Sequence, residues 1–196
     1  MGRPRNYSDA EVLERAIDVF WANGFEGTSI TDLVAQLGIN RSTMYAFFGD
    51  KEALYHRALV EYARRLAADR EAEMVCPGDP LAGISRWLRS LSEGAANDTS
   101  RRGCFIGAAA LERLPQHADT LSIVEADLAH TQRLITECLV RARDHGQLRD
   151  DLDITAAAAL LHTLAQGIRI LAKADPRSPT AALAFDTALS TLTRPA

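Results

Sequence analysis

We predict an all-α fold of about nine helices for this chain of 196 residues. Only 6% of the residues are aromatic, and alanine and leucine, which favour helices, crowd the C-terminal half. No alternating run of Val, Ile, Thr and aromatic residues is long enough to predict a strand. Capping residues before apolar stripes of helical spacing, with glycine or proline after them, mark where successive helices begin and end.

The N-terminal part of the chain predicts three short helices. Ser8 and Glu11 form a capping box for the first helix, which ends at Gly24. Two further helices follow over residues 29–37 and 41–48, and a tight glycine turn separates them. Two short helices joined by such a turn are the helix–turn–helix pattern, in which the second helix reads DNA.

The remaining chain predicts six further helices, most of them longer. They are expected over residues 50–74, 80–96, 103–114, 117–145, 153–174 and 178–192. We expect a helix–turn–helix DNA-binding domain over residues 1–50. The long helix 50–74 would join it to a larger helical domain over residues 75–196.

Residues 24–54 carry the most specific motif in the chain. They read GFEGTSITDLVAQLGINRSTMYAFFGDKEAL and closely resemble the DNA-binding signature of the TetR family of transcriptional regulators. The resemblance implies a repressor that binds a palindromic operator as a homodimer and leaves it when a small-molecule effector binds the C-terminal domain. Phe47 stands where many members of that family carry His.

The residue chemistry of this segment also points to double-stranded DNA as the partner. A recognition helix inserts its N-terminal end into the major groove, where Arg41 can pair with guanine and Thr43 can contact a thymine methyl group. Tyr45 and Lys51 can reach phosphates, and a basic tail can follow the DNA backbone or minor groove. The residues expected to contact DNA are Arg3, Arg5, Thr28, Ser29, Arg41, Ser42, Thr43, Tyr45, Phe47 and Lys51.

The net charge of −4 argues against binding to nucleic acid, which is itself negatively charged. The first 57 residues hold six basic and eight acidic side chains. DNA binding therefore requires the basic residues to gather on one face, with the acids of the first helix turned away. Two alternatives stay open: Arg41 and Lys51 belong to a solvated face beside core aromatic residues, or the protein is a helical adaptor without DNA binding. Leu33, Met44 and Phe48 are expected in the core.

Beyond about residue 75 the resemblance extends to architecture only, so the effector itself is not predicted. An effector pocket needs a few polar groups among apolar side chains. The residues expected to line it are Trp87, Leu88, Leu91, Cys104, Phe105, Ala108, Glu112, Asp127, Thr131, His162 and Gln166.

Cys104 allows two interpretations. It follows two arginines and a glycine at an expected helix N-terminus, where cations and the helix dipole lower a thiol pKa. It could therefore sense electrophiles or oxidants, as in some relatives of the TetR family, or be a buried thiol that packs as a small hydrophobe. The three cysteines lack metal-ligand spacing and are odd in number, so neither a metal site nor a disulfide framework is expected.

The last two helices carry apolar stripes that need a partner. Small residues beside them allow close helix approach, so we expect a four-helix bundle built from two copies of the chain. The interface is expected to contain Leu160, Gly167, Leu171, Phe185, Leu189 and Leu192.

Other classes of protein are not expected. The start of the chain lacks the apolar stretch of a signal peptide, and the longest apolar run, residues 156–161, is too short to span a bilayer. A cytoplasmic protein without membrane contact is the resulting expectation. The sequence shows no nucleophile elbow, zinc-protease motif or phosphate-binding glycine loop, so no enzyme activity and no cofactor are expected.

Overall fold

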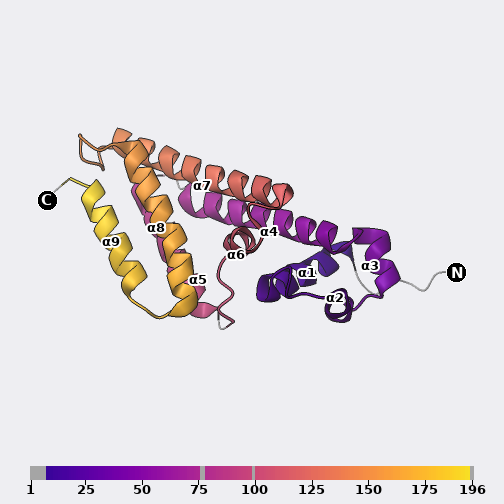
Figure 1. Ribbon diagram of the computed structural model, residues 1–196. Helices are drawn as coiled ribbons and strands as arrows, with labels where there is room; N and C mark the ends of the chain where they lie inside the picture. Colours follow the sequence, from indigo (N-terminus) through magenta and orange to yellow (C-terminus); the bar gives the residue numbers. More distant parts are fainter. Residues whose placement is uncertain (1–7, 76–77, 99, 195–196) are drawn as a thin grey trace. The chain divides into compact units, whose positions relative to one another are not determined.

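The computed structural model of the protein describes residues 8–75, 78–98 and 100–194. Over these residues the chain forms nine α-helices and no β-strand, which confirms the predicted fold class (Figure 1). The helices are α1 (Asp9–Asn23), α2 (Ile30–Leu37), α3 (Arg41–Phe48), α4 (Lys51–Met74), α5 (Pro80–Asn97), α6 (Phe105–Arg113), α7 (Ala118–Asp144), α8 (Ile154–Ala174) and α9 (Thr180–Leu192).

Local capping determines where the first four helices begin. The side chains of Ser8, Ser29, Asn40 and Asp50 each accept a hydrogen bond from the backbone N–H three residues further on. Such a bond satisfies one of the N–H groups that the first turn of a helix leaves without a partner. The capping box of Ser8 and Glu11, which the sequence predicts, is confirmed.

The helices form two compact units. The first contains Met1–Arg64 and Cys104–Val124, and the second contains Arg65–Gly103 and Glu125–Ala196. Both α4 and α7 therefore run through the two units. The boundary expected at residue 75 divides the chain into two consecutive segments. The compact units differ from this division, because α6 belongs to the same unit as the helix–turn–helix.

The core of the first unit joins the three N-terminal helices to α4 and α6. Leu33, Met44 and Phe48 are buried there, as the sequence predicts. Phe105 of α6 packs edge to face against Tyr55 and Tyr62 of α4, with ring centroids 5.6 and 5.5 Å apart. These aromatic contacts explain why α6 belongs to this unit.

The core of the second unit lies between α5, α7, α8 and α9. Helices α5, α8 and α9 pack against one another (Figure 1). The largest apolar side chain among them, Trp87 of α5, is fully buried together with Leu88. Ile135 and Leu139 add the apolar face of α7 to the same cluster.

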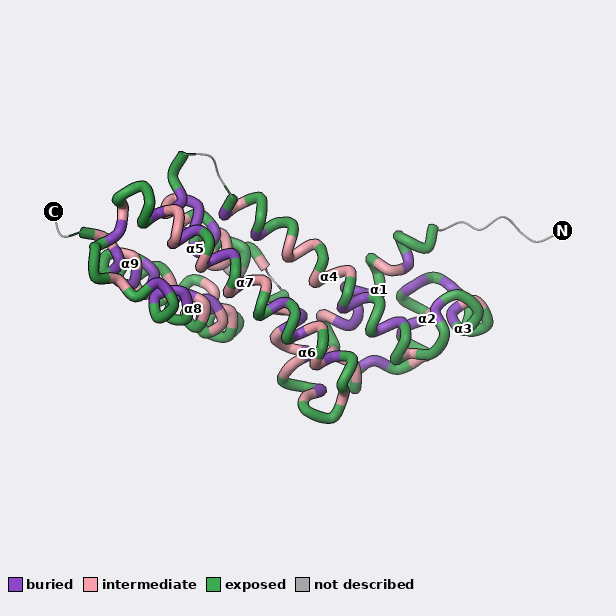
Figure 2. The backbone as a smooth tube through the Cα atoms, turned by 90° about the horizontal axis from the view of Figure 1, so that it is seen from above, coloured by how far each residue is buried: buried purple, intermediate pink, exposed green. Residues whose placement is uncertain are grey.

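Helix α8 is apolar on two sides. Residues Ile154–Leu171 are long and apolar enough to cross a membrane by length and composition, although only a third of this segment is buried. One side supplies the core residues Ala158, Leu161 and Ala165. Another side exposes Leu160 and Ile170, and exposed residues alternate with buried ones along the helix in Figure 2. Helix α8 is therefore a core helix with an apolar outer face, which gives it the length and composition of a membrane span.

A buried ion pair joins α4 to α7 within the second unit. The Arg70 Nη2 atom lies 2.8 Å from Asp127 Oδ1 and 3.0 Å from Oδ2, and the two side chains are only 1% and 2% exposed. Thr131, also buried, donates its hydroxyl to the Asp127 carbonyl oxygen at 2.9 Å. The sequence does not predict this pair, because its partners are 57 residues apart.

We predict that Asp127→Asn destabilises the second unit by about 3 to 5 kcal/mol, because it removes the negative charge that faces a buried guanidinium. Urea unfolding, followed by Trp87 fluorescence in a Trp21→Phe background, measures the change. The matched control is Asp150→Asn, which breaks the exposed Arg194–Asp150 pair and should have little effect. Equal effects of the two substitutions would contradict the importance of the buried pair.

Candidate nucleic-acid interface

The recognition helix α3 presents a polar face to solvent. Arg41 and Ser42 are exposed at its N-terminal end, and Tyr45 and Phe47 are exposed further along. Met44 and Phe48, on the other side, are buried in the core. The helix therefore sets its apolar side against the core, where it packs on α2, and leaves the short polar side chains of its first turn accessible.

Three of the predicted DNA contacts, Arg41, Thr43 and Ser29, form hydrogen bonds within the fold. The Arg41 Nη2 atom is 3.4 Å from the Thr31 hydroxyl of α2, a long contact that leaves the guanidinium at the surface. Thr43 is half-buried, and its backbone N–H donates to the Asn40 cap. Ser29 is exposed, but its hydroxyl donates to Asp32 Oδ2 at 2.6 Å within a capping box.

Two of the predicted phosphate contacts have other roles inside the fold. Thr28 is only 1% exposed, and its hydroxyl donates to the Gly24 carbonyl oxygen at 2.6 Å. Its side chain is therefore not presented to DNA. The Lys51 ammonium donates to the carbonyl oxygens of Phe25 and Thr28, at 2.7 and 2.8 Å. Two of its three N–H groups thus hold the α1–α2 loop, which the sequence did not predict. Arg3 and Arg5 lie outside the described residues.

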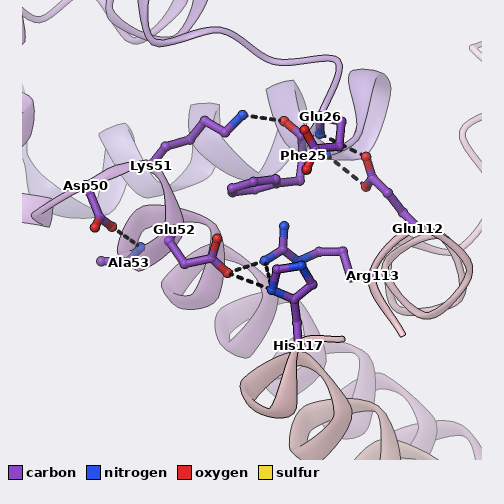
Figure 3. Close-up of polar contacts among 9 residues, drawn as sticks. All are labelled: Phe25, Glu26, Asp50, Lys51, Glu52, Ala53, Glu112, Arg113 and His117. Carbon is purple, nitrogen blue, oxygen red and sulfur yellow. Dashed lines mark hydrogen bonds and ion pairs between the residues drawn. The ribbon is translucent and has the colours of Figure 1, made fainter. Parts of the chain in front are cut away.

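The α1–α2 loop is also held from α6 (Figure 3). The Glu112 carboxylate accepts hydrogen bonds from the backbone N–H groups of Phe25 and Glu26, both at 2.9 Å. Gly24 has a positive φ of 73°, and a Cβ atom there would lie 2.8 Å from Glu112 Oε1. A glycine is therefore needed both for the backbone conformation and for the approach of the carboxylate.

Arg113, the neighbour of Glu112, is buried beside the same loop. Its guanidinium pairs with Glu52 of α4 and lies 3.9 Å from the centroid of the Phe25 ring. The Lys51 ammonium is 4.0 Å from the centroid of that ring, so Phe25 lies between two cations (Figure 3). Burial and the nearby Glu112 charge raise the pKa of Tyr55 well above its usual range, so the phenol beside Arg113 stays neutral.

The residues predicted to line an effector pocket fall into different compact units. Cys104, Phe105, Ala108 and Glu112 belong to the first unit. The members that belong to the second unit are Trp87, Leu88, Leu91, Asp127, Thr131, His162 and Gln166. Glu112 bonds to the α1–α2 loop, and Phe105 packs on the tyrosines of α4. The structure thus gives these two side chains a role in the packing of the first unit.

The second unit contains a polar cluster that joins α7 to α8. His162 Nδ1 lies 3.0 Å from Gln132 Oε1, and His162 Nε2 lies 3.1 Å from Gln166 Nε2. Burial lowers the pKa of His162, the cations Arg169 and Arg70 lower it further, and Asp127 opposes them. The imidazole is therefore neutral at neutral pH.

The cysteines differ in their surroundings. Cys138 is buried, its thiol donates to the Met74 carbonyl oxygen at 3.5 Å, and burial raises its pKa. Cys104 is half-buried and stands at the N-cap position of α6. Cys76 lies outside the described residues. Among the described residues, no group of three or more His, Cys, Asp or Glu side chains is placed to hold a metal ion.

The residues predicted at a dimer interface divide into two groups. Leu160, Gly167 and Leu171 are exposed on α8, whereas Phe185 and Leu192 of α9 are buried in the core of their own chain. Leu189 is partly buried and packs against that core. The apolar stripe of α9 covers α5 and α8, so most of it already has a partner within the chain.

An apolar groove runs along the outer side of α8 and α9. It has a volume of about 510 Å³. Its lining residues are Leu160, Leu164, Thr180, Leu183, Ala184, Thr187, Ala188 and Thr191. Leu183, a member of the apolar stripe on the last helix, is 63% exposed there. An isolated leucine at the surface is common, but several along one groove indicate a contact surface.

Sequence reasoning missed Arg113 and the structural role of Lys51. Both side chains bind to elements that lie far away in the chain, so no local spacing marks them. One signal was available: Glu112 and Arg113 are adjacent opposite charges at the end of a helix that is otherwise apolar, FIGAAALER. Such a pair at the end of an apolar helix can indicate a polar contact with another element.

Two family models match the chain. Residues 12–58 match the bacterial regulatory proteins of the tetR family, and residues 80–187 match the tetracyclin repressor-like C-terminal domain. The HTH-type transcriptional repressor ComR of Escherichia coli (strain K12) is 27% identical over 88% of this chain and 82% of its own length. The HTH-type transcriptional regulator YezE of Bacillus subtilis (strain 168) is 32% identical over 88% and 90%.

Solved structures are similar over nearly the whole chain. A cysteine-substituted form of the TetR family regulator CifR, in complex with a 26-bp double-strand operator DNA, has a TM-score of 0.84 at 30% identity. It covers 97% of this chain and 100% of its own. The reduced form of NemR from E. coli has a TM-score of 0.85 at 16% identity over 95% and 97%, which shows the shared fold. The chain therefore belongs to the TetR family of bacterial regulatory proteins, and it is a transcriptional regulator and not an enzyme.

Proposed function

We propose that the protein is a transcriptional repressor that binds a palindromic operator in double-stranded DNA as a homodimer and is released by a small-molecule effector. The observation that carries the proposal is the exposed polar N-terminal end of α3, in a chain that belongs to the TetR family. The relative ComR is named as a repressor, and CifR is seen on operator DNA. Such a repressor acts in the cytoplasm, where the DNA of a bacterium lies.

The first turn of α3 is the part of the protein that would contact the DNA bases. Arg41 can donate two hydrogen bonds to one guanine, and Ser42 and Thr43 are short enough to meet base edges beside it. Tyr45 and the exposed Phe47 lie further along the helix, where a phosphate or a sugar would be in reach. The partly exposed Lys51 keeps one N–H group that the loop carbonyls do not use, which suffices for a phosphate contact.

The acidic net charge does not prevent this binding. Asp32 and Asp50 accept backbone N–H groups at the starts of α2 and α4, and Glu11 does the same at α1. Glu52 pairs with Arg113. Half of the acidic residues among the first 57 are thus held in caps or pairs, while Arg41 remains at the surface of α3. The local charge at the recognition helix, rather than the net charge, decides the approach of DNA.

The apolar groove of α8 and α9 is the surface that we propose as the dimer interface. A second copy of the chain would cover Leu160, Leu164 and Leu183 with its own copies of these residues, as a two-fold axis requires. Two helices from each copy would then form a four-helix bundle. A two-fold dimer matches a palindromic operator, because each copy meets one half-site.

The effector is proposed to bind in the second unit. The polar groups of His162, Gln132 and Gln166 lie among apolar helices there, which is the mixture that a small-molecule site needs. Release from DNA requires that the effector bind more tightly to the form that cannot bind DNA. Helix α4 runs from the second unit to Lys51, three residues after the end of the recognition helix, so it offers a continuous path for such a change.

We predict that Arg41→Lys weakens binding by about 1 to 3 kcal/mol at one base pair of each half-site, because lysine keeps the charge but loses the bidentate geometry. Affinities for operator variants changed one base pair at a time measure this effect. The operator is a duplex that the wild-type protein selects from a randomised pool. Arg177→Lys, on the exposed turn before α9, is the matched control. An unchanged base preference in Arg41→Lys would overturn the assignment of Arg41 to base readout.

We predict that Leu183→Glu yields monomers, because it places a charge in the apolar groove that the second copy would cover. Sedimentation at several protein concentrations measures the association. The matched control is Leu111→Glu on α6, since Leu111 is 81% exposed and lies outside the groove. A Leu183→Glu protein that remains dimeric would place the interface elsewhere.

We predict that any compound that releases the protein from DNA binds more weakly when the operator is present, by the same factor by which it weakens DNA binding. Compounds that raise the unfolding temperature of the protein are titrated calorimetrically with and without the selected duplex. A duplex of the same length and scrambled sequence is the control. Equal affinity in both titrations for every compound would exclude release by effector.

A further inference from the structure

We propose that Glu112 of α6 is a positioning residue for DNA binding: it holds the α1–α2 loop and so keeps the recognition helix in the geometry that binds the operator. The inference rests on the proposed function and adds to it a residue that does not touch DNA. Its basis is a set of contacts within the first compact unit, all between described residues (Figure 3).

Both the backbone N–H groups and the backbone carbonyl groups of the α1–α2 loop bind charged side chains. Its N–H groups at Phe25 and Glu26 donate to the two carboxylate oxygens of Glu112, each at 2.9 Å. Its carbonyl groups at Phe25 and Thr28 accept from the Lys51 ammonium of α4. The loop is therefore fixed between an anion from α6 and a cation from α4. Hydrogen bonds to charged groups are the strong ones among those that side chains make.

Neighbouring residues are adapted to this contact. Gly24 leaves the space that the carboxylate occupies, since a Cβ atom would lie within 2.8 Å of Glu112 Oε1. Arg113 anchors the end of α6 by pairing with Glu52 of α4 and by stacking on the Phe25 ring. These contacts fix the direction in which Glu112 points, so the side chain is placed to bind the loop although it is exposed to solvent.

The loop leads directly into the recognition pair. Ser29, three residues after Glu26, caps α2, and α3 follows α2 after a short turn. Segment Cys104–Val124, which contains α6, is connected at both ends to the second unit. Glu112 is therefore a direct polar link from that segment to the backbone of the loop. A change in the placement of α6 would act on the recognition pair even if α4 stayed in place.

The test is Glu112→Gln, which keeps the size of the side chain and removes its charge. Amide hydrogen exchange, measured by NMR, should become at least about tenfold faster at Phe25 and Glu26, because a neutral amide cannot accept both N–H groups with the strength of a carboxylate. The amides of Val12 and Phe20 in α1 should keep their protection. Affinity for the duplex that the wild-type protein selects from a randomised pool should fall by about tenfold.

The matched control is Glu125→Gln, an exposed residue of α7 that removes the same charge. Loss of a negative charge by itself favours DNA binding. If Glu112→Gln weakens the complex with DNA and Glu125→Gln does not, the change in net charge therefore cannot explain the difference. Unchanged exchange at Phe25 and Glu26, or unchanged affinity, would overturn the inference. Faster exchange throughout α1 would also overturn it, because Glu112 would then be a general stabilising residue. If the wild-type protein selects no duplex, the proposed function fails, and the amide exchange still tests the contact with the loop.

Discussion

Phe25 lies between the Lys51 ammonium and the Arg113 guanidinium, and the backbone on either side of it is bound to charged groups of α4 and α6. A loop between two short helices has few apolar contacts of its own, so its conformation depends on such external partners. The position of α2 and α3 on the rest of the first unit follows from this arrangement. The face that we propose to bind DNA thus depends on contacts with a segment 86 to 87 residues away in the chain.

Several charged side chains form contacts within the fold of this protein. Carboxylates cap three of the first four helices, and two buried arginines, Arg70 and Arg113, each face an acid from another element. Arg70 and Asp127 are both buried, and removing one member of such a pair costs far more stability than the pair itself contributes, so this contact favours one packing over alternatives. The exposed Arg41 stands apart from these internal contacts. An acidic chain can therefore carry a surface that suits DNA.

The second unit combines two apolar surfaces on one helix. The inner side of α8 completes the core, and its outer side forms a groove with α9. This arrangement explains why the helix is as apolar as a membrane span while the composition of the chain as a whole is that of a globular protein. The groove is the feature that an association of two chains would cover, and it belongs to the second unit, whereas α3 belongs to the first.

The sequence by itself determined the helices, their limits and the helix–turn–helix, because caps and glycine turns act between residues three or four positions apart. The buried residues of α2 and α3 could be predicted for the same reason, since helical spacing places them on one side. Only the tertiary structure decided the roles of Thr28, Lys51, Glu112, Phe185 and Leu192. Long charged side chains and apolar stripes choose their partners through the packing of helices that lie far apart in the chain, 61 residues for Glu52 and Arg113 and 87 for Phe25 and Glu112. Local spacing contains no information about which helix will be the neighbour, and that choice is made by the core.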